Sequence, residues 1–298
     1  MARIALVTAA SARGLDEDLF PLELALRDRD VAYAVVDWDD PEVDWGAFDV
    51  ALIRSTWDYS SRIREFLAWA ERVSSATKLQ NPSSLIAWNV DKHYLRNLAD
   101  AGCATVPTAY VEPGERARTG LSSFLLRHEA EEFVVKPAIS GGSRDTQRYR
   151  RSELNRAEAH VARLTASGRS VVLQPYLSSV DREGETALIF FRGQFSHAIR
   201  KGPLLKLDGE ATRALFAPEH ISAREPSADE LACASQVLAS IAAEPPLYAR
   251  VDLIRDALGQ PRLLEAELTE PSLFFDYAPR SADRLVDSLL ESLAPAEL

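Results

Sequence analysis

Three carboxylates near the end of the chain have the spacing of a metal site. Glu265 and Glu267 lie two residues apart in an expected strand, so their side chains point to the same side of it. Asp252 lies in the preceding apolar segment, and we expect Leu247–Arg255 and Pro261–Glu267 to form one antiparallel hairpin. Crowded carboxylates repel one another and need a cation, and such hard oxygen ligands suit Mg²⁺. A solvated acidic strand edge is the alternative, which the many leucine and valine neighbours disfavour.

A lysine followed by a glycine-rich turn could bind an anion. Phe133–Lys136 is an expected strand that ends in Lys136, and Ser140, Gly141, Gly142 and Ser143 follow. Successive backbone N–H groups in such a turn form an anion nest, which small residues let a phosphate approach. Because the lysine precedes the glycines and lies on a strand, this is not a Walker motif. Taken alone, an ordinary hairpin with a surface lysine explains the segment equally well.

Two further segments carry weaker signals. Asp91 and Lys92 open an expected helix over Asp91–Gly102, where an acidic cap before a solvated lysine is the ordinary interpretation. Gln174–Leu177 ends an apolar strand and leads into an acidic loop that closes with Glu185. Such a strand exit could offer its backbone to an adenine edge, and Glu185 could accept hydrogen bonds from ribose hydroxyls. Without the other motifs, a simple strand exit with a proline is the preferred interpretation.

Strands alternating with helices over the first 83 residues predict a small α/β lobe with a parallel sheet. Asn81-Pro82 is a turn signal and a plausible boundary of this lobe. The expected elements are strands at Ile4–Val7, Val31–Asp37 and Asp49–Ile53, a helix at Asp16–Arg29, and a helix whose apolar stripe runs from Ile63 to Val73.

Two further lobes follow in the pattern. The first has expected strands at Thr108–Val111, Phe133–Lys136 and Val171–Leu173, with helices at Leu121–Ala130 and Ser152–Ser167. The second is built on two antiparallel hairpins, since Thr186–Phe191 and Gln194–Lys201 flank a tight Arg-Gly turn. Helices at Ser227–Ala242 and Ala282–Leu293 are expected to pack on these hairpins.

Composition excludes several classes of protein. The 298-residue chain carries a net charge of −11, which argues against a nucleic-acid or anionic-membrane surface. Its two cysteines, Cys103 and Cys233, have neither metal nor redox spacing. No apolar run reaches membrane-spanning length and the N-terminus does not have the pattern of a signal peptide, so a cytoplasmic location is expected.

In order and spacing, these motifs resemble the ATP-grasp superfamily, similar to glutathione synthetase, the ribosomal-protein glutamate ligases and D-alanine–D-alanine ligase. The resemblance covers essentially the whole chain, and its motifs are individually loose but jointly specific. It implies ATP, Mg²⁺ with two ions expected, and an α/β fold that is α+β in the ATP-binding lobes. The implied division is an N-terminal α/β pre-ATP-grasp domain at 1–83, a C-terminal ATP-grasp lobe at 84–107 and 174–298, and a small central lid lobe at 108–173.

The resemblance also implies roles for individual residues. Lys92 and Lys136 would hold the α- and β-phosphates, with the glycine-rich turn closing over them. Gln174, Tyr176 and Leu177 match the adenine-binding stretch, and Glu185 matches the ribose position. Arg200 matches the arginine that stabilises the transferring phosphoryl group.

The sequence departs from the superfamily pattern in two places. Glu267 stands where the metal set commonly ends in asparagine, and this extra negative charge should raise the demand for metal. A basic residue often found just after the ribose carboxylate is absent, Ala187 standing near that place. Positive charge must then come from elsewhere, and the candidates are Arg144, Lys201 and Arg250. We therefore expect Arg200, Lys201 and Arg250 to be catalytic.

A finer resemblance starts with Arg54-Ser55-Thr56-Trp57-Asp58-Tyr59 directly after a strand. Together with Asn81-Pro82, Trp88-Asn89 and Ser196–Pro203, this segment resembles the D-cycloserine synthetase group, the O-ureidoserine cyclo-ligases of antibiotic biosynthesis. The resemblance implies phosphorylation of the carboxylate of O-ureido-D-serine, ring closure by the ureido nitrogen, and loss of CO₂ and ammonia. Residues expected to bind this amino acid are Arg54, Ser55, Thr56, Arg200 and Ser272.

Core packing is the alternative for Trp57 and Tyr59, and no residue stands out as a general base. Two other functions stay open. A ligase of the same superfamily could join an amino acid to a separate amine. A catalytically silent ATP-binding regulatory module is opposed by the complete set of carboxylates. The expected partner is a small amino-acid substrate, and the oligomeric state is open, a homodimer included.

Overall fold

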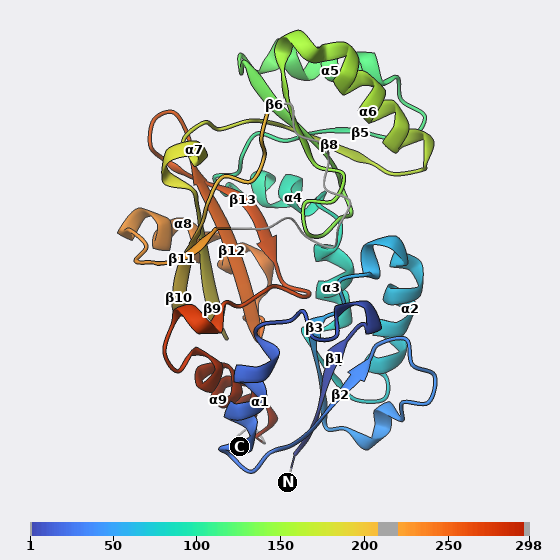
Figure 1. Ribbon diagram of the computed structural model, residues 1–298, viewed down its shortest axis with the longest axis vertical. Coiled ribbons are helices and arrows are strands. Elements are labelled where there is room, and N and C mark those ends of the chain that lie inside the picture. Colours follow the sequence, from blue (N-terminus) through green and yellow to red (C-terminus); the bar gives the residue numbers. More distant parts are fainter. Residues whose placement is uncertain (1, 208–219, 295–298) are drawn as a thin grey trace.

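The computed structural model describes residues 2–207 and 220–294 and contains three β-sheets, each with its own helices (Figure 1). The first sheet is parallel, with strand order β2–β1–β3–β4. Its elements are β1 (Arg3–Thr8), β2 (Ala32–Asp37), β3 (Val50–Ser55), β4 (Lys78–Gln80), α1 (Leu19–Arg27), α2 (Ile63–Ser74) and α3 (Ser83–Asn89). The three predicted strands and two predicted helices are confirmed, whereas β4 and α3 were not predicted.

Side-chain alternation along β1 explains why helices cover both faces of this sheet. Ile4 and Leu6 pack in a cluster with α1, whereas Ala5 and Val7 pack in a second cluster with α2. Such an apolar strand must be buried on both sides, as parallel strands usually are.

The second sheet is antiparallel, with order β5–β8–β6–β7. Helices α5 and α6 pack on it through one apolar cluster, and Figure 1 shows both on the same face of the sheet. The predicted strands and helices are confirmed, but β7 was missed because only Tyr149 in it is both apolar and buried. The elements are β5 (Ala109–Val111), α5 (Ala117–Arg127), β6 (Glu132–Pro137), β7 (Gln147–Arg150), α6 (Leu154–Ala166) and β8 (Val171–Pro175).

The third sheet is antiparallel, with order β11–β10–β9–β12–β13, and it confirms both predicted hairpins. One face packs against α4 and α8, and the other packs against α9 and α1. The elements are α4 (Tyr94–Asp100), α7 (Val180–Glu183), β9 (Glu185–Phe191), β10 (Gln194–Lys201), β11 (Ile221–Arg224), α8 (Ala228–Ile241), β12 (Tyr248–Arg255), β13 (Pro261–Glu267) and α9 (Ser281–Leu293). Helix α4 is shorter than the expected Asp91–Gly102, which leaves Lys92 just ahead of its first turn.

One hydrophobic core joins the first and third sheets. Helices α1 and α9 lie side by side, and their apolar residues share a cluster with β1, β3, β9 and β12 (Figure 1). The buried amide of Asn81 adds polar links: it donates to Tyr248 O at 3.0 Å and Leu268 O at 2.6 Å and accepts from Leu247 N at 2.8 Å. These contacts fix the β12–β13 hairpin relative to the N-terminal sheet.

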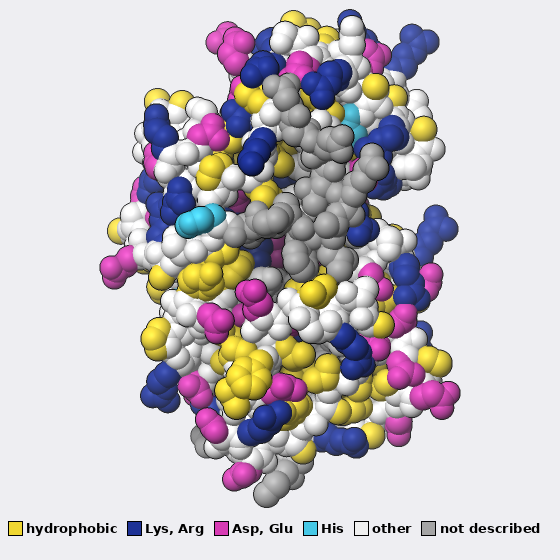
Figure 2. Space-filling view, viewed as in Figure 1, with side chains coloured by type: hydrophobic (Ala, Val, Ile, Leu, Met, Phe, Trp, Pro, Cys, Tyr) yellow, Lys and Arg dark blue, Asp and Glu magenta, His cyan; other side chains and the backbone are white. Residues whose placement is uncertain are grey.

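The face in Figure 2 mixes acidic and basic side chains over its lower half, with hydrophobic side chains between them. Among the helices of residues 2–207 and 220–294, none has the length and apolar character needed to cross a membrane.

Candidate active site

A cavity of about 540 Å³ is lined by residues of the second and third sheets and by residues of the N-terminal lobe that lie outside its strands. This volume lies in the usual range of small-molecule sites. Most of the residues predicted from the sequence line it: Lys92, Lys136, Ser140, Gly141, Gly142, Ser143, Gln174, Tyr176, Leu177, Glu185, Lys201, Arg250, Asp252, Glu265, Glu267 and Ser272.

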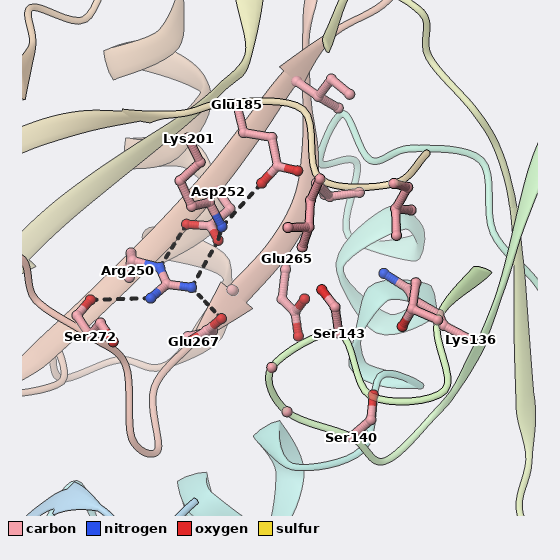
Figure 3. A pocket seen from close by; sticks show the side chains of 18 of the residues that line it. Lys136, Ser140, Ser143, Glu185, Lys201, Arg250, Asp252, Glu265, Glu267 and Ser272 are labelled. Atoms are coloured by element: carbon pink, nitrogen blue, oxygen red, sulfur yellow. Dashed lines mark hydrogen bonds and ion pairs between the residues drawn. The ribbon is translucent and has the colours of Figure 1, made fainter. Parts of the chain in front are cut away.

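The β12–β13 hairpin places the predicted carboxylates together on one wall (Figure 3). Asp252 lies opposite Glu265, and Arg250 lies opposite Glu267, so all four side chains share a face of the hairpin. Arg250 pairs with Asp252 at 2.9 Å and also pairs with Glu267. Glu265 pairs with Lys92, so each of the three carboxylates has a cationic partner. Within the described part of the chain, no group of three acidic, histidine or cysteine side chains is arranged to hold a metal ion.

Lys201 completes this charge cluster from the neighbouring strand β10. Its ammonium lies 2.6 Å from Asp252 and 3.0 Å from Glu185. It thus supplies the positive charge that the sequence lacks near Ala187. Figure 3 shows Lys201, Glu185, Asp252 and Arg250 connected by these contacts.

Burial and neighbouring charges shift the pKa values of the three carboxylates in different directions. Burial would raise the pKa of Asp252, but Arg250 and Lys201 outweigh it and lower that pKa. Lys92 and Lys136 likewise lower the pKa of Glu265 against burial. For Glu267, burial is the largest effect, and together with the negative charges of Asp252 and Glu265 it raises the pKa to about 7. The positive charge of Arg250 acts in the opposite direction but is too weak to cancel these effects. Glu267 is therefore the carboxylate that most requires an additional cation.

The two predicted phosphate lysines are buried rather than solvated. Lys92 donates to Ser140 O at 2.9 Å and pairs with Glu265 at 2.9 Å. Lys136 is 7% exposed, and no residue that the structure describes forms a hydrogen bond or ion pair with its ammonium. Burial lowers the pKa of Lys136 to about 8. A buried ammonium without such a partner is costly, so this part of the cavity is built for an anion.

The glycine-rich turn lies across the cavity from the hairpin (Figure 3). Gly142 and Ser143 adopt positive φ values of 59° each, and Asp145 follows with 55°. Such a backbone presents successive N–H groups on its concave side, which favours an anion. Asp145 does not line the cavity; its carboxylate pairs with Arg163 at 2.9 Å and with Arg169 at 2.8 Å.

The opposite end of the cavity is apolar. Tyr176, Leu177 and Leu264 pack here against a small buried cluster of Val106, Val180 and Ile254. Gln174 is fixed by a 2.9 Å hydrogen bond from its amide to the Thr108 hydroxyl, and the Arg148 guanidinium lies 3.4 Å from the centre of the Tyr176 ring. An apolar region beside a strand exit suits an adenine ring.

Four expected residues are not among those lining the cavity, and these expectations need correction. Because side chains alternate along β10, Lys201 faces the cavity and Arg200 faces away, donating to Glu183 O at 2.7 Å and Arg182 O at 3.2 Å. Arg54 is 1% exposed and lies 3.5 Å from Asp18. Ser55 and Thr56 are also buried, and the Ser55 hydroxyl lies 2.7 Å from that of Thr8. Arg144, the spare candidate for positive charge, does not line the cavity either.

The segment after Glu267 was missed by sequence reasoning. Glu270, Ser272 and Phe274 line the cavity, and of these only Ser272 was predicted. Arg54 does not line the cavity, but it binds this segment by donating to Pro271 O at 3.3 Å. The Asp18 carboxylate accepts the backbone N–H groups of residues 273, 274 and 275 at 2.5–3.2 Å. The acidic pair Asp16 and Asp18 ahead of α1 was the available signal.

These residues fit a nucleoside triphosphate with a divalent cation. The apolar region suits the base, and the two buried lysines and the curled turn suit phosphates. Hard carboxylate oxygens, one of them with a raised pKa, suit Mg²⁺ beside phosphate oxygens. Ligand oxygens would complete a coordination shell that the carboxylates alone do not form.

Comparison with known proteins agrees with this geometry. A family model for the N-terminal domain of D-cycloserine synthetase DcsG matches residues 4–81. Cycloserine biosynthesis protein DcsG of Streptomyces lavendulae is 44% identical over 301 residues, covering 99% of this chain and 100% of that protein. The crystal structure of D-cycloserine synthetase DcsG superposes with a TM-score of 0.93 at 43% identity, covering 98% of this chain and 100% of that one.

More distant structures share the fold. D-alanine–D-alanine ligase from Bacillus anthracis superposes with a TM-score of 0.69 at 14% identity, covering 98% of this chain and 97% of that one. The ATP-grasp ligase PsnB, in a complex with Mg and ADP, superposes with a TM-score of 0.66 at 19% identity, with 98% of each chain covered. With full-length similarity to DcsG and the ATP-grasp architecture together, the chain belongs to the D-cycloserine synthetase family and is a ligase with the ATP-grasp fold.

Proposed function

We propose that this ligase uses Mg²⁺ and ATP to convert O-ureido-D-serine into D-cycloserine, releasing ADP, phosphate, CO₂ and ammonia. The observation that carries the ATP-dependent step is the buried Lys136 ammonium, which has no hydrogen-bond or ion-pair partner among the described residues and lies beside the carboxylate hairpin. The choice of substrate is supported by the similarity to DcsG over the whole chain.

Each part of ATP can be assigned to a part of the cavity. The base would occupy the apolar region of Tyr176, Leu177 and Leu264, with the Gln174–Leu177 backbone at its edge and Glu185 at the ribose. Lys92 and Lys136 would neutralise the α- and β-phosphates, because both ammonium groups are buried in the cavity wall. The glycine-rich turn would cover the phosphates and exclude water.

Asp252, Glu265 and Glu267 would hold Mg²⁺, which neutralises phosphate charge during phosphoryl transfer when it is bound. Arg250 and Lys201 would then be released in part from their carboxylate partners. Their positive charge could stabilise the oxygen that develops charge as the substrate carboxylate is phosphorylated and attacked.

Ring closure follows from enforced proximity. The phosphate group makes the carboxylate carbon reactive, and the ureido nitrogen of the same molecule attacks it to form a five-membered ring. A tethered nucleophile has an effective concentration on the order of 10⁵ M or more in favourable geometry, so no separate amine is needed. We further propose that residues 108–173 act as the lid over the nucleotide, and that residues 1–83 and the C-terminal lobe form its base.

The number of organic substrates tests this proposal against its main rival, a ligase that joins two molecules. ADP release should proceed with O-ureido-D-serine alone, and an added amine should neither accelerate it nor appear in the product. A coupled ADP assay followed by mass spectrometry measures both. Turnover that requires a second amine would overturn the cyclo-ligase function and leave the ATP-grasp fold unaffected. A cytoplasmic location and a homodimer stay predictions, for cell fractionation and light scattering to test.

A further inference from the structure

Ring closure needs a group that removes a proton from the attacking nitrogen. Among the cavity-lining carboxylates that the structure describes, Glu185, Asp252, Glu265 and Glu267 pair with cations, and Asp18 accepts three backbone N–H groups. Glu17 and Asp276 are exposed to solvent. Glu270 differs from all of these, because it lines the cavity without an ion-pair partner among the described residues.

Aromatic residues of the N-terminal lobe orient Glu270. The Tyr59 hydroxyl lies close enough to the Glu270 carboxylate to lower its pKa, and Tyr59 is itself buried at 4% exposure. The Trp57 indole donates to the backbone carbonyl of Glu270 at 3.4 Å. Arg54 donates to the next carbonyl, Pro271 O, at 3.3 Å, so two successive backbone carbonyls beside the carboxylate are held by the N-terminal lobe.

The Glu270 carboxylate reaches the phosphate-binding part of the cavity. A Cβ atom placed on Gly141 would lie 3.9 Å from Glu270 Oε1, so the carboxylate lies against the glycine-rich turn. A phosphorylated substrate carboxylate must lie beside this turn if the turn covers the transferred phosphate. Glu270 is thus within reach of the atoms that react after phosphoryl transfer.

We propose that Glu270 is the proton acceptor for ring closure, an inference that rests on the proposed function. The ureido nitrogen forms a bond to the carboxylate carbon, and the bond from that carbon to the phosphate oxygen breaks. Phosphate leaves with the electron pair, and the proton of the nitrogen passes to the Glu270 carboxylate. Tyr59 is a positioning residue that holds the carboxylate toward the nitrogen.

The local electrostatics support this role. Burial and the neighbouring charge of Glu267 together raise the pKa of Glu270 to about 8. A carboxylate with a raised pKa is a stronger base than an ordinary one, and general-base catalysis is most effective when this value lies near the working pH.

Glu270→Gln separates phosphoryl transfer from ring closure. With O-ureido-D-serine and ATP, the variant should still release ADP within about threefold of the wild-type rate, while D-cycloserine formation falls on the order of 100-fold. Hydroxylamine added to the assay should trap the accumulated acyl phosphate as a hydroxamate, which wild type should form only in traces. Glu71→Gln, the same change at an exposed site on α2, should match wild type in all three measurements.

Tyr59→Phe supplies a second test that does not remove the carboxylate. It should raise the ratio of hydroxamate to D-cycloserine, as Glu270→Gln does, but by a smaller factor. Its affinity for ATP, measured by calorimetry, should equal that of wild type. Either ring formation at the wild-type rate in Glu270→Gln, or an equal loss of ADP release and ring formation, would overturn the proposal. Failure of wild type to release ADP with O-ureido-D-serine would instead overturn the proposed function.

Discussion

Lys136 is a buried cation that the proposed nucleotide would neutralise. Its pKa of about 8 lies below the ordinary 10.5, so the protonated form costs roughly 3 kcal/mol in the folded protein. That cost is fully present below pH 8 and fades as the pH rises toward the ordinary lysine value.

Lys136→Met should therefore raise the free energy of unfolding at pH 7 by about 1–3 kcal/mol and lower ATP affinity more than tenfold. The gain in stability should shrink at pH 10. Chemical denaturation at both pH values and titration calorimetry with ATP measure these effects, with Lys78→Met on the exposed edge strand as the matched control. Unchanged ATP affinity would remove Lys136 from the phosphate site.

Glu267 should make the protein without nucleotide less stable as the pH rises, whereas a carboxylate with a lowered pKa makes a protein more stable. Its pKa is raised to about 7, so its contribution to stability is present at low pH and is lost as the pH rises through 7. Glu267→Gln should flatten the fall in melting temperature between pH 6 and pH 8 and weaken Mg²⁺ binding in the presence of ATP. Glu71→Gln is the control, and an identical pH profile in the Glu267 variant would contradict the assignment.

Residue-scale errors in the sequence analysis have physical causes. Arg200 and Lys201 are adjacent basic residues on one strand, and a shift of one position reverses which of them faces the cavity. Arg54 is bound by two aspartates that lie at least 36 positions earlier in the chain, which no local pattern reveals. Glu270 follows a strand in an irregular segment, where there is no periodicity from which to predict its direction.

At the scale of elements, the glycine-rich turn should change most on nucleotide binding. A Cβ atom placed on Gly141 would meet nothing nearer than Glu270 Oε1 at 3.9 Å, so the turn is loosely packed at this position. Hydrogen exchange across residues 140–145 should slow when a non-hydrolysable ATP analogue binds, whereas exchange in the buried strand β9 should not change. Equal exchange of the turn with and without the analogue would argue against a phosphate lid.

The link between the N-terminal sheet and the metal hairpin depends on Asn81. Asn81→Ala would leave two backbone carbonyls and one backbone N–H without their buried partner, which should cost about 2–4 kcal/mol of unfolding free energy. Asn155→Ala on the exposed face of α6 should change this quantity by less than about 0.5 kcal/mol. Urea denaturation of both variants gives the comparison, and equal effects would show that Asn81 does not fix the hairpin.

Elements with strong periodicity were predictable from the sequence, including both hairpins and the carboxylate face of β12–β13. The apolar runs define these strands, and alternation then fixes which side chains share a face. Strand β7 and helix α3 were missed because β7 is largely polar and α3 follows directly on the boundary proline. The cavity itself depends on how the second and third sheets meet the loops of the N-terminal lobe, and only the resemblance to ATP-grasp enzymes indicated that arrangement.

At the scale of the whole molecule, the shared core explains how residues far apart in sequence form one site. Clusters of α1, α9 and the strands between them anchor the N-terminal lobe to the C-terminal sheet. The lobes thereby bring Trp57 and Tyr59, which follow strand β3, against the segment that follows β13. The site proposed for ring closure exists only in the assembled molecule.

The central claim is that one molecule is both phosphorylated at its carboxylate and attacked by its own nitrogen. O-ureido-D-serine with both carboxylate oxygens replaced by ¹⁸O tests both parts in a single turnover experiment. Mass spectrometry should find one ¹⁸O atom in each released phosphate and one in the carbonyl of the cyclic product, with no amine incorporated. Unlabelled phosphate, or a product that contains a second molecule, would contradict the account.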